Sequence, residues 1–467
     1  MKKVLVIVLA TFLVLSPLLA EKESATTSYS IEDIEKSMKE DNASLRKARE
    51  VYNQSLLDVK DAKANYQPQI EALLTTTFMP NPPIGKTSIS MDELSSQLGV
   101  TIPGAVSGEY VTLYKGMKNT YYNAGLTITQ PIYTWGKIPR AVDLYEEIAN
   151  IRALNIQDSE EKLSAELKTR LSALCYMNEL FTILDETQEK ANELVAMSED
   201  GYKNGMLLKE DVTKAKISAL EISVKRQELV KQYNDNLQAL KSISALDDLD
   251  AENISYTVNE EEIKYISSLT KDEINTLVLG PKNKSLAMLR SQTKALELKK
   301  KVASADLYWK PDFALQVSLN YGGPALPLVE TNWYRSNDYG LYLTFAVKTT
   351  VWDGGKKLNA VKHAESEIEG SYADYDDAVN QLKSATEENL TQIELSNVKL
   401  EYLGLKLEEA QDRLNLLNTQ YEQGLISKTN VLSQEIEINT DRGEIIQEKI
   451  NLSKAVYTIC YLAGIDD

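Results

Sequence analysis

The sequence predicts a mainly helical chain that also carries four β-strands of the kind found in membrane barrels. Three observations lead to this fold class. Glycine and proline are scarce, with 20 and 12 among 467 residues, as in proteins dominated by long helices. Four segments alternate apolar and polar residues with the period of a strand. Most of the chain also falls into two copies of one pattern, which indicates a protomer built from two similar halves.

The amino terminus predicts export from the cytoplasm. Two lysines precede an apolar run that reaches Leu15, and the small residue Ala20 stands before Glu21. This pattern is typical of a secretory signal peptide, which we place at residues 1–20. A membrane-anchoring helix fits less well, because Pro17 ends the run short of the roughly 20 residues that span a bilayer. We therefore expect any membrane crossing to be made by strands.

The internal repeat organises the rest of the chain. The segment Tyr202–Leu207 returns as Tyr421–Ile426, at an offset of 219 residues. The same offset relates the Gly-Lys pair that begins at Gly136 to the pair that begins at Gly355. An earlier match has an offset of 243, so the first copy carries 24 additional residues, which we expect in the loop near residues 80–120.

These matches divide the exported chain into three parts. Residues 21–245 are predicted to form a first structural repeat, and residues 281–467 a second. Between them, residues 246–280 lose the helical periodicity and become acidic. We expect a linker or a small side structure there.

Each repeat is expected to contribute two strands. Leu315, Val317 and Leu319 alternate with Gln316 and Ser318, which indicates a sheet with one apolar face. Runs of about 10 residues can cross a membrane at a tilt. Aromatic residues gather at the strand ends, as in the girdles of outer-membrane barrels. A soluble sheet can show the same features, but the signal peptide favours the membrane. The four strands are expected near residues 69–79, 121–133, 311–321 and 339–351.

Two helices of unusual length follow the strands. Between Lys137 and Asn204 the helix-breaking residues are Pro139, tolerated in a first turn, and Gly201, near the end. At 1.5 Å per residue such a helix is about 100 Å long. The run from Lys356 to Gln423 is similar. Apolar residues at sevenfold spacing predict coiled-coil seams, as at Val431, Ile438, Ile445 and Leu452.

Gly205 and Gly424 are predicted to end these helices. Glycine accepts the left-handed conformation that commonly closes a helix, so the chain can reverse there into a returning helix. We expect both turns at the same end of the molecule, far from the strands.

Four strands do not complete a barrel. An open sheet edge in lipid would leave backbone N–H and C=O groups without hydrogen-bond partners. A membrane sheet of this size must therefore close with strands from further copies of the chain.

With a signal peptide, two helix–strand–strand–helix copies, Gly-Lys pairs after the strands and Tyr-x-x-Gly turns, the sequence resembles the TolC family of outer-membrane efflux ducts. The resemblance covers nearly the whole exported chain. It implies a homotrimer with a shared twelve-stranded barrel in outer-membrane lipid and a helical periplasmic tunnel. It also implies a passive conduit of tripartite efflux or type I secretion, docked to a periplasmic adaptor (membrane fusion) protein and an inner-membrane RND or ABC pump.

The same resemblance implies a gate at the helix turns. In such ducts a tyrosine, an arginine and acidic residues hold the tip closed, and Tyr421 and Asp211 fit this pattern. Ile426 stands where an arginine is found, and Asn430 and Ser433 stand where acidic residues ring the pore. Without those charges, gating would rest on hydrogen bonds and packing, or on other acidic residues, for which Glu210 and Glu435 are candidates.

Ordinary capping and packing explain the same positions equally well. Adaptor docking is expected at the exposed turns, with candidates Gly205, Leu207, Gly424, Leu425 and Ile426.

The sequence gives no support for an enzyme, and we expect no catalytic residue, cofactor or metal site. The one histidine, His363, lies in a charged helical run. Cys175 and Cys460 are far apart, so they are either small buried hydrophobes or a bridge between packed helices. The segment 85–88 lacks the earlier glycine of a phosphate loop. A net charge of −18 disfavours nucleic acid as a partner.

Two other readings remain open from the sequence. One is a soluble periplasmic coiled-coil scaffold in which the strands form a small sheet. The other, a self-sufficient porin, is less consistent with the pattern, because it needs many more strands per chain and no long helices.

Overall fold

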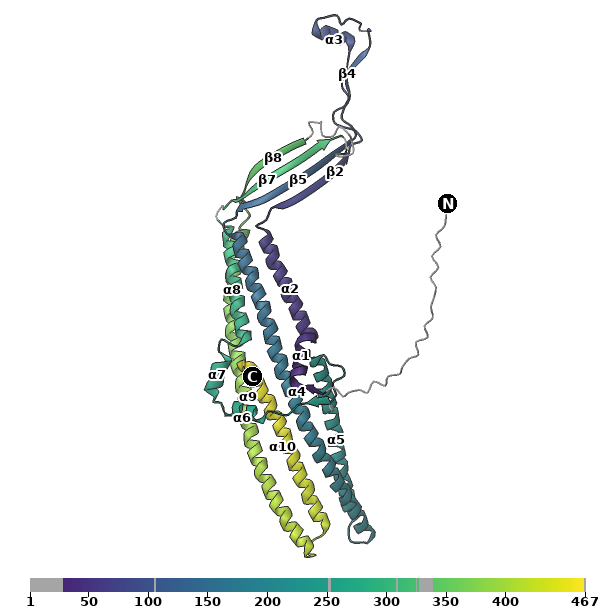
Figure 1. Cartoon of the computed structure of the whole chain (residues 1–467), viewed down its shortest axis with the longest axis vertical. Helices are drawn as coiled ribbons and strands as arrows, with labels where there is room; N and C mark the ends of the chain where they lie inside the picture. The colour runs from purple at the N-terminus through teal and green to yellow at the C-terminus, as the bar shows by residue number, and fades with distance from the viewer. Residues whose placement is uncertain are drawn as a thin grey trace, which may run out of the picture. The chain divides into compact units, whose positions relative to one another are not determined.

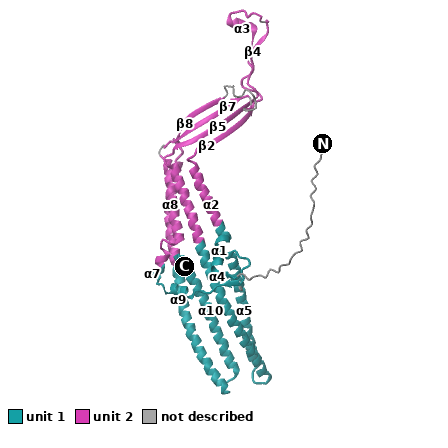
Figure 2. Ribbon diagram, in the orientation of Figure 1, with its two compact units in different colours: residues 1–46, 160–274, 386–467 teal, residues 47–159, 275–385 magenta. Residues whose placement is uncertain are grey.

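The computed structural model describes residues 28–104, 106–250, 253–307, 310–324, 326 and 339–465. The predicted signal peptide at residues 1–20 lies outside these ranges. The described chain forms two compact units (Figure 2). Unit 1 comprises residues 1–46, 160–274 and 386–467, and unit 2 comprises residues 47–159 and 275–385. Each unit therefore draws on both predicted sequence repeats.

Two helix pairs of matched length dominate the chain (Figure 1). Helices α4 (Lys137–Lys203) and α9 (Lys356–Glu422) have 67 residues each. Short turns connect them to α5 (Lys209–Ser244) and α10 (Lys428–Ala463), with 36 residues each. The predicted fold class, mainly helical with few strands, is confirmed.

The core of unit 1 lies between α1 (Ile31–Asp41), α4 and α5. A break at Asn42 separates α1 from α2 (Ala43–Ala64). The Asn42 side chain accepts a hydrogen bond from the Ser44 backbone at 2.9 Å and donates one to the Ile243 carbonyl at 2.9 Å. This residue therefore starts α2 and ties it to α5. The core side chains are fully or nearly fully buried, among them Ile34, Met38, Leu167, Leu171 and Leu240.

The coiled-coil seams contain the apolar residues that sevenfold spacing picked out. Val431, Ile438 and Leu452 are buried along α10, with exposed fractions of 6–8%. At 3.5 residues per turn, this spacing keeps one apolar stripe facing the neighbouring helices.

The segment between the repeats folds into small elements within unit 1 and unit 2. Strand β6 (Ile254–Ser255) pairs in parallel with β1 (Tyr29–Ser30), and α6 (Glu260–Ser268) and α7 (Lys271–Val278) follow. In unit 2, α8 (Lys284–Ala305) leads to the second pair of strands.

Unit 2 contains an antiparallel sheet in the order β2-β5-β7-β8. Its strands are β2 (Gln69–Phe78), β5 (Thr120–Tyr133), β7 (Asp312–Gly323) and β8 (Tyr339–Lys348). The pairing of β5 with β7 joins strands from the two repeats. Pro131 is accommodated inside β5 because the register shifts there, between Pro131 and Tyr133.

A separate insertion lies between β2 and β5. It contains β3 (Thr87–Ser90), α3 (Met91–Leu98) and β4 (Tyr110–Tyr114). Asp92 closes the insertion, because its carboxylate accepts hydrogen bonds from the Ser107 hydroxyl at 3.1 Å and the Gly108 backbone at 3.0 Å. The segment that resembled the end of a phosphate loop enters β3 rather than a helix.

None of the helices formed by the described residues combines the length and the hydropathy that crossing a membrane requires.

Candidate functional site: the strand sheet and the helix turns

The sheet has one apolar and one polar face. In an antiparallel pair, residues directly opposite each other point to the same face. One row across the four strands consists of Ile70, Ile128, Val317 and Leu343, and the next consists of Ala72, Leu126, Leu319 and Leu341. The rows that alternate with these are polar, with Gln69, Thr129, Gln316 and Thr344 in one and Glu71, Thr127, Ser318 and Tyr342 in another.

The apolar face is exposed in the single chain. Leu341, Leu343 and Ile70 are 74%, 73% and 65% exposed, and Phe345 is 61% exposed. Soluble proteins rarely leave such a continuous apolar surface in water, because each buried Å² of it is worth about 25 cal/mol. This face therefore belongs against lipid or against another protein surface.

The two edge strands are open along their length. Among the described strands, β2 pairs only with β5, and β8 pairs only with β7. All ten residues of β2 are exposed. A long, open apolar edge is a ready template for pairing with a strand of another chain.

A network of charges fixes the join between the sheet and the helices of unit 2. The Lys137 ammonium donates to both carboxylate oxygens of Asp312 at 2.8–2.9 Å and forms an ion pair with Asp306. Lys357 lies 3.1 Å from the other oxygen of Asp306. Burial raises the pKa of Asp306, but hydrogen bonds from Lys137 and Lys357 outweigh it, and the pKa is lowered overall. In the first copy, the lysine of the repeated Gly-Lys pair therefore connects the start of α4 to the start of β7 and to Asp306.

The backbone just before Lys137 is bent sharply. Trp135 and Gly136 have φ values of 53° and 78°, so both adopt a left-handed conformation. The Trp135 indole N–H donates to the Pro311 carbonyl at 2.9 Å, which holds this unusual tryptophan conformation in place.

In unit 1, the two helix turns have the same geometry. Gly205 and Gly424 both have a φ of 71°. The amide of each glycine donates to the carbonyl of the tyrosine three residues earlier, Tyr202 at 3.0 Å and Tyr421 at 2.9 Å. Only glycine adopts this conformation without strain, so the Tyr-x-x-Gly motif encodes the turn itself.

The predicted gate residues occupy different environments. Asp211 accepts a hydrogen bond from the Leu208 backbone at 3.0 Å and so caps the start of α5. Tyr421 is 43% exposed, and no hydrogen bond between it and Asp211 is recorded in the described part of the chain. Asn430 and Ser433 are exposed, and Ile426 is half-buried.

The predicted docking residues also differ in their environments. Leu207 packs against Gly201, where an added Cβ would lie 2.7 Å from its Cδ1. Leu425 is 69% exposed. Sequence reasoning missed Met206 and Leu208, which follow Gly205 in the other turn and are 75% and 69% exposed. The run of three apolar residues after Gly205, at positions 206–208, was the available signal.

Two ion pairs connect α4 to α10 near the turns. The Lys190 ammonium lies 2.5 Å from the Glu435 carboxylate, and Lys428 pairs with Glu193. The hydrogen bond to Glu193 raises the pKa of Lys428, with a smaller contribution from Tyr421. Of the alternative acidic candidates, Glu435 therefore joins two hairpins, whereas Glu210 pairs with Lys214 in its own helix at 2.7 Å.

Buried charges also join α9 to α10. Asp441 is 1% exposed and accepts a hydrogen bond from Lys406 at 2.6 Å. Glu448, 6% exposed, accepts one from the Ser396 hydroxyl at 2.6 Å. Since an unpaired buried charge is costly, these contacts specify one register of the two helices.

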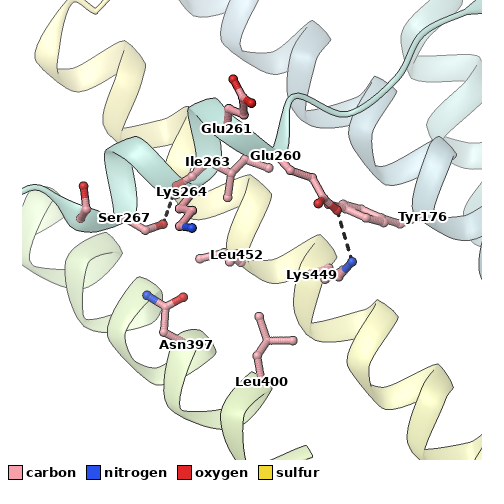
Figure 3. Close-up of a pocket in the computed structure, with 11 residues that line it drawn as sticks. Tyr176, Glu260, Glu261, Ile263, Lys264, Ser267, Asn397, Leu400, Lys449 and Leu452 are labelled. Carbon is pink, nitrogen blue, oxygen red and sulfur yellow. Dashed lines mark hydrogen bonds and ion pairs between the residues drawn. The ribbon is translucent and has the colours of Figure 1, made fainter. Parts of the chain in front are cut away.

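A pocket of about 590 Å³ lies between α6, α9, α10 and α4 in unit 1 (Figure 3). The Lys449 ammonium lies 3.3 Å from the Glu260 carboxylate and 5.7 Å from the centre of the Tyr176 ring. Burial raises the pKa of Tyr176 to about 12, so its hydroxyl stays protonated. This arrangement offers no activated nucleophile.

The described residues contain no cluster of three or more His, Cys, Asp or Glu side chains that could hold a metal ion. Cys175 is half-buried, and its thiol donates to the Tyr256 carbonyl at 3.4 Å. Cys460 is a buried thiol, and no disulfide joins the two. Burial raises the pKa of Cys175 to about 11, which makes it unreactive.

A family model described as outer membrane efflux protein matches residues 36–247 and 281–464. The chain belongs to the outer membrane efflux protein family. The resemblance stated from the sequence is thereby confirmed. The two matched stretches leave out residues 248–280, which include β6, α6 and α7. Among curated proteins, none matches this efflux family member significantly in sequence.

Solved channel structures share the fold of this outer membrane efflux protein. VceC of Vibrio cholerae is 15% identical with a TM-score of 0.70, over 93% of this chain and 96% of VceC. CmeC of Campylobacter jejuni is 12% identical with a TM-score of 0.71, over 94% and 87% of the two chains. The open state of MtrE of Neisseria gonorrhoeae is 12% identical with a TM-score of 0.67, over 93% and 88%. The TM-scores establish a likeness of fold, and at identities this low they establish the fold alone.

Proposed function

We propose that this chain is one protomer of a trimeric exit duct in the outer membrane, a passive conduit rather than an enzyme. In this assembly the sheet lies in the membrane and the helices extend into the periplasm. The exposed apolar face of the sheet, flanked by two open edges, carries this proposal.

Closure of the barrel follows from the two edges. In lipid, β8 of one copy must pair with β2 of the next, because each unpaired backbone group there costs several kcal/mol. Three copies of the four-stranded sheet give twelve strands, enough to enclose a water-filled bore. The apolar rows then face lipid and the polar rows face the bore.

The helix turns are the proposed periplasmic tip. Exposed apolar side chains at both turns, Met206, Leu208 and Leu425, would dock a periplasmic adaptor protein that connects to an inner-membrane RND or ABC pump. Gly205, Leu207, Gly424 and Ile426 shape this surface. The tip is also the proposed gate, with Tyr421, Asp211, Asn430 and Ser433 near the opening.

Three of the solved structures support the same proposal by their described roles. VceC is described as an outer membrane protein, and CmeC and MtrE as outer membrane channels. A soluble scaffold does not account for an apolar sheet face that no described part of the chain covers.

The deciding experiment is detergent extraction of outer membranes, followed by native mass measurement of the purified protein. We expect a detergent-dependent trimer. A monomer or dimer released by osmotic shock without detergent would overturn the proposal in favour of the soluble scaffold. Loss of efflux with unchanged passive uptake in a deletion strain would further distinguish a duct from a porin.

A further inference from the structure

Three glycines stand together on the polar face of the sheet, toward the strand ends that lead into the loops. Gly125 and Gly340 lie in one row, on either side of Asn320. Gly322 lies in the next row, opposite Asn123. None of the three has a positive φ. Their backbone conformation therefore does not require glycine, and the reason for it must be space.

Tyrosine rings occupy the space above two of these glycines. A Cβ added at Gly340 would lie 2.5 Å from Cε2 and 2.6 Å from the hydroxyl oxygen of Tyr342. A Cβ added at Gly322 would lie 2.7 Å from the hydroxyl oxygen of Tyr121. Real Cβ atoms do not come this close to other heavy atoms. The ring of Tyr342 therefore lies along its own strand, over bare backbone, and the tip of Tyr121 lies over the neighbouring strand.

The rows that hold these rings carry little charge. Glu71 is the one charged residue in the described rows that hold the two tyrosines and three glycines, and it lies on β2, at the opposite edge of the sheet from Tyr342 on β8. Tyrosine rings attract cations through their electron-rich faces and stack on other aromatic rings. The faces of these two rings thus suit a positively charged molecule that also carries an aromatic group.

We propose that Tyr121 and Tyr342, seated over Gly322 and Gly340, form an aromatic collar that lines the bore near its outer mouth and contacts aromatic cations as they leave. The collar rests on the proposed function, because only in a closed barrel does the polar face line a bore. The glycines keep the rings against the wall, and they thereby set the local width.

The test is a double-mutant series measured as single-channel conductance of the purified protein in planar bilayers. Gly340→Ala is expected to lower the conductance, because the added methyl group displaces the Tyr342 ring into the bore. Tyr342→Ala is expected to raise it. In the double variant, Gly340→Ala should have no further effect, because the ring that it displaces is gone. An equal loss of conductance from Gly340→Ala with and without Tyr342 would overturn the collar.

Binding is tested with benzyltrimethylammonium as a blocker of the current, compared with tetramethylammonium. Tyr342→Ala should weaken block by the aromatic cation about two- to fivefold, as expected for the loss of one exposed cation–π contact per copy. Tyr342→Phe should retain the block. Thr344→Ala, on the same face but away from the glycines, is the matched control and should leave both quantities unchanged. Unchanged block in Tyr342→Ala would contradict the proposed contact.

Because a closed tip would limit the current whatever the collar does, the series is also recorded with Lys190→Met and Lys428→Met together, which remove the two ion pairs between α4 and α10 and are expected to open the tip. Failure of the collar and failure of the proposed function give different results. A wild-type protein that forms no channel overturns the proposed function and the collar with it. If the wild-type protein forms a channel but the Tyr342 variants leave both conductance and block unchanged, the collar alone is overturned.

Discussion

The sheet of unit 2 and the helix turns of unit 1 differ in what specifies them. The sheet is specified by a pattern repeated over many residues, so its apolar face persists when any one residue changes. Each turn depends on a single glycine and a few side chains that meet from distant parts of the chain. Substitutions in the sheet should therefore impair trimer assembly in proportion to the polarity of the new side chain. Substitutions at the turns should instead affect opening of the channel, with little loss of stability.

The largest effect is expected from a charge on the apolar sheet face. Leu343→Arg should destabilise the membrane-inserted trimer by about 2–4 kcal/mol per copy, because the guanidinium must leave water for lipid. Thr344→Arg, the next residue on the opposite face, is the control and should be tolerated. The measurement is the fraction of trimer that survives a urea titration in lipid vesicles. Equal sensitivity of the two positions would remove the distinction between the faces.

The second largest effect is expected from the charge network that joins the sheet to the helices of unit 2. Lys137→Met leaves the carboxylates of Asp306 and Asp312 with fewer partners, and we expect a loss of about 1–2 kcal/mol in the free energy of unfolding. The matched control is Lys300→Met, which removes an exposed ion pair with Glu365 and should change stability by less than about 1 kcal/mol. Guanidinium unfolding in detergent measures both. A loss no greater than that of the control would show that the network is dispensable.

Asp211 tests whether a turn residue acts as a cap or as a gate. Asp211→Ala should cost about 1 kcal/mol, because it removes the acceptor for the Leu208 backbone N–H. Asp211→Asn keeps an acceptor and should restore most of that stability. If Asp211 also holds the tip closed by its charge, both variants combined with Tyr421→Phe should raise the conductance. Conductance unchanged in both combinations would leave Asp211 as a cap alone.

The smallest change in stability, with a large change in opening, is expected from the ion pairs between α4 and α10. Lys190→Met with Lys428→Met removes two partly exposed pairs, each worth about 0–1 kcal/mol. We expect a higher single-channel conductance and a nearly unchanged unfolding midpoint. Lys214→Met, which removes a pair within α5, should alter neither. A large loss of stability without a change in conductance would contradict a gating role.

The sheet, the long helices and the turn glycines could be predicted because each is encoded locally. Period-2 alternation, the lack of helix breakers and the Tyr-x-x-Gly motif need only neighbouring residues. The pairs Lys190–Glu435 and Lys428–Glu193 could not, because their members are more than 230 residues apart and the exposed faces of the helices carry many other charges that could pair. To recognise Asp211 as a cap, the position of the Leu208 backbone N–H had to be known. The family resemblance, which pointed to a gate, did not supply it.

The glycines under Tyr121 and Tyr342 are a second case in which the sequence alone did not reveal the contacts of a residue. A glycine inside a strand is ordinarily a weak point, and its sequence neighbours do not say what fills the gap. Tyr342 is two residues from Gly340, but Tyr121 precedes Gly322 by 201 residues. The register of β5 against β7 had to be known before that contact could be seen.

The insertion that carries α3 has a consequence for how this protein can change over time. Asp92 closes it with hydrogen bonds inside the insertion, and the pairing of β2 with β5 is unbroken from Gln69 opposite Thr129 to Phe78 opposite Thr120. The chain can therefore lengthen, shorten or replace this segment without shifting any strand of the sheet. Descendants of this sequence are free to vary what they present at this loop while inheriting the same strand pairing beneath it.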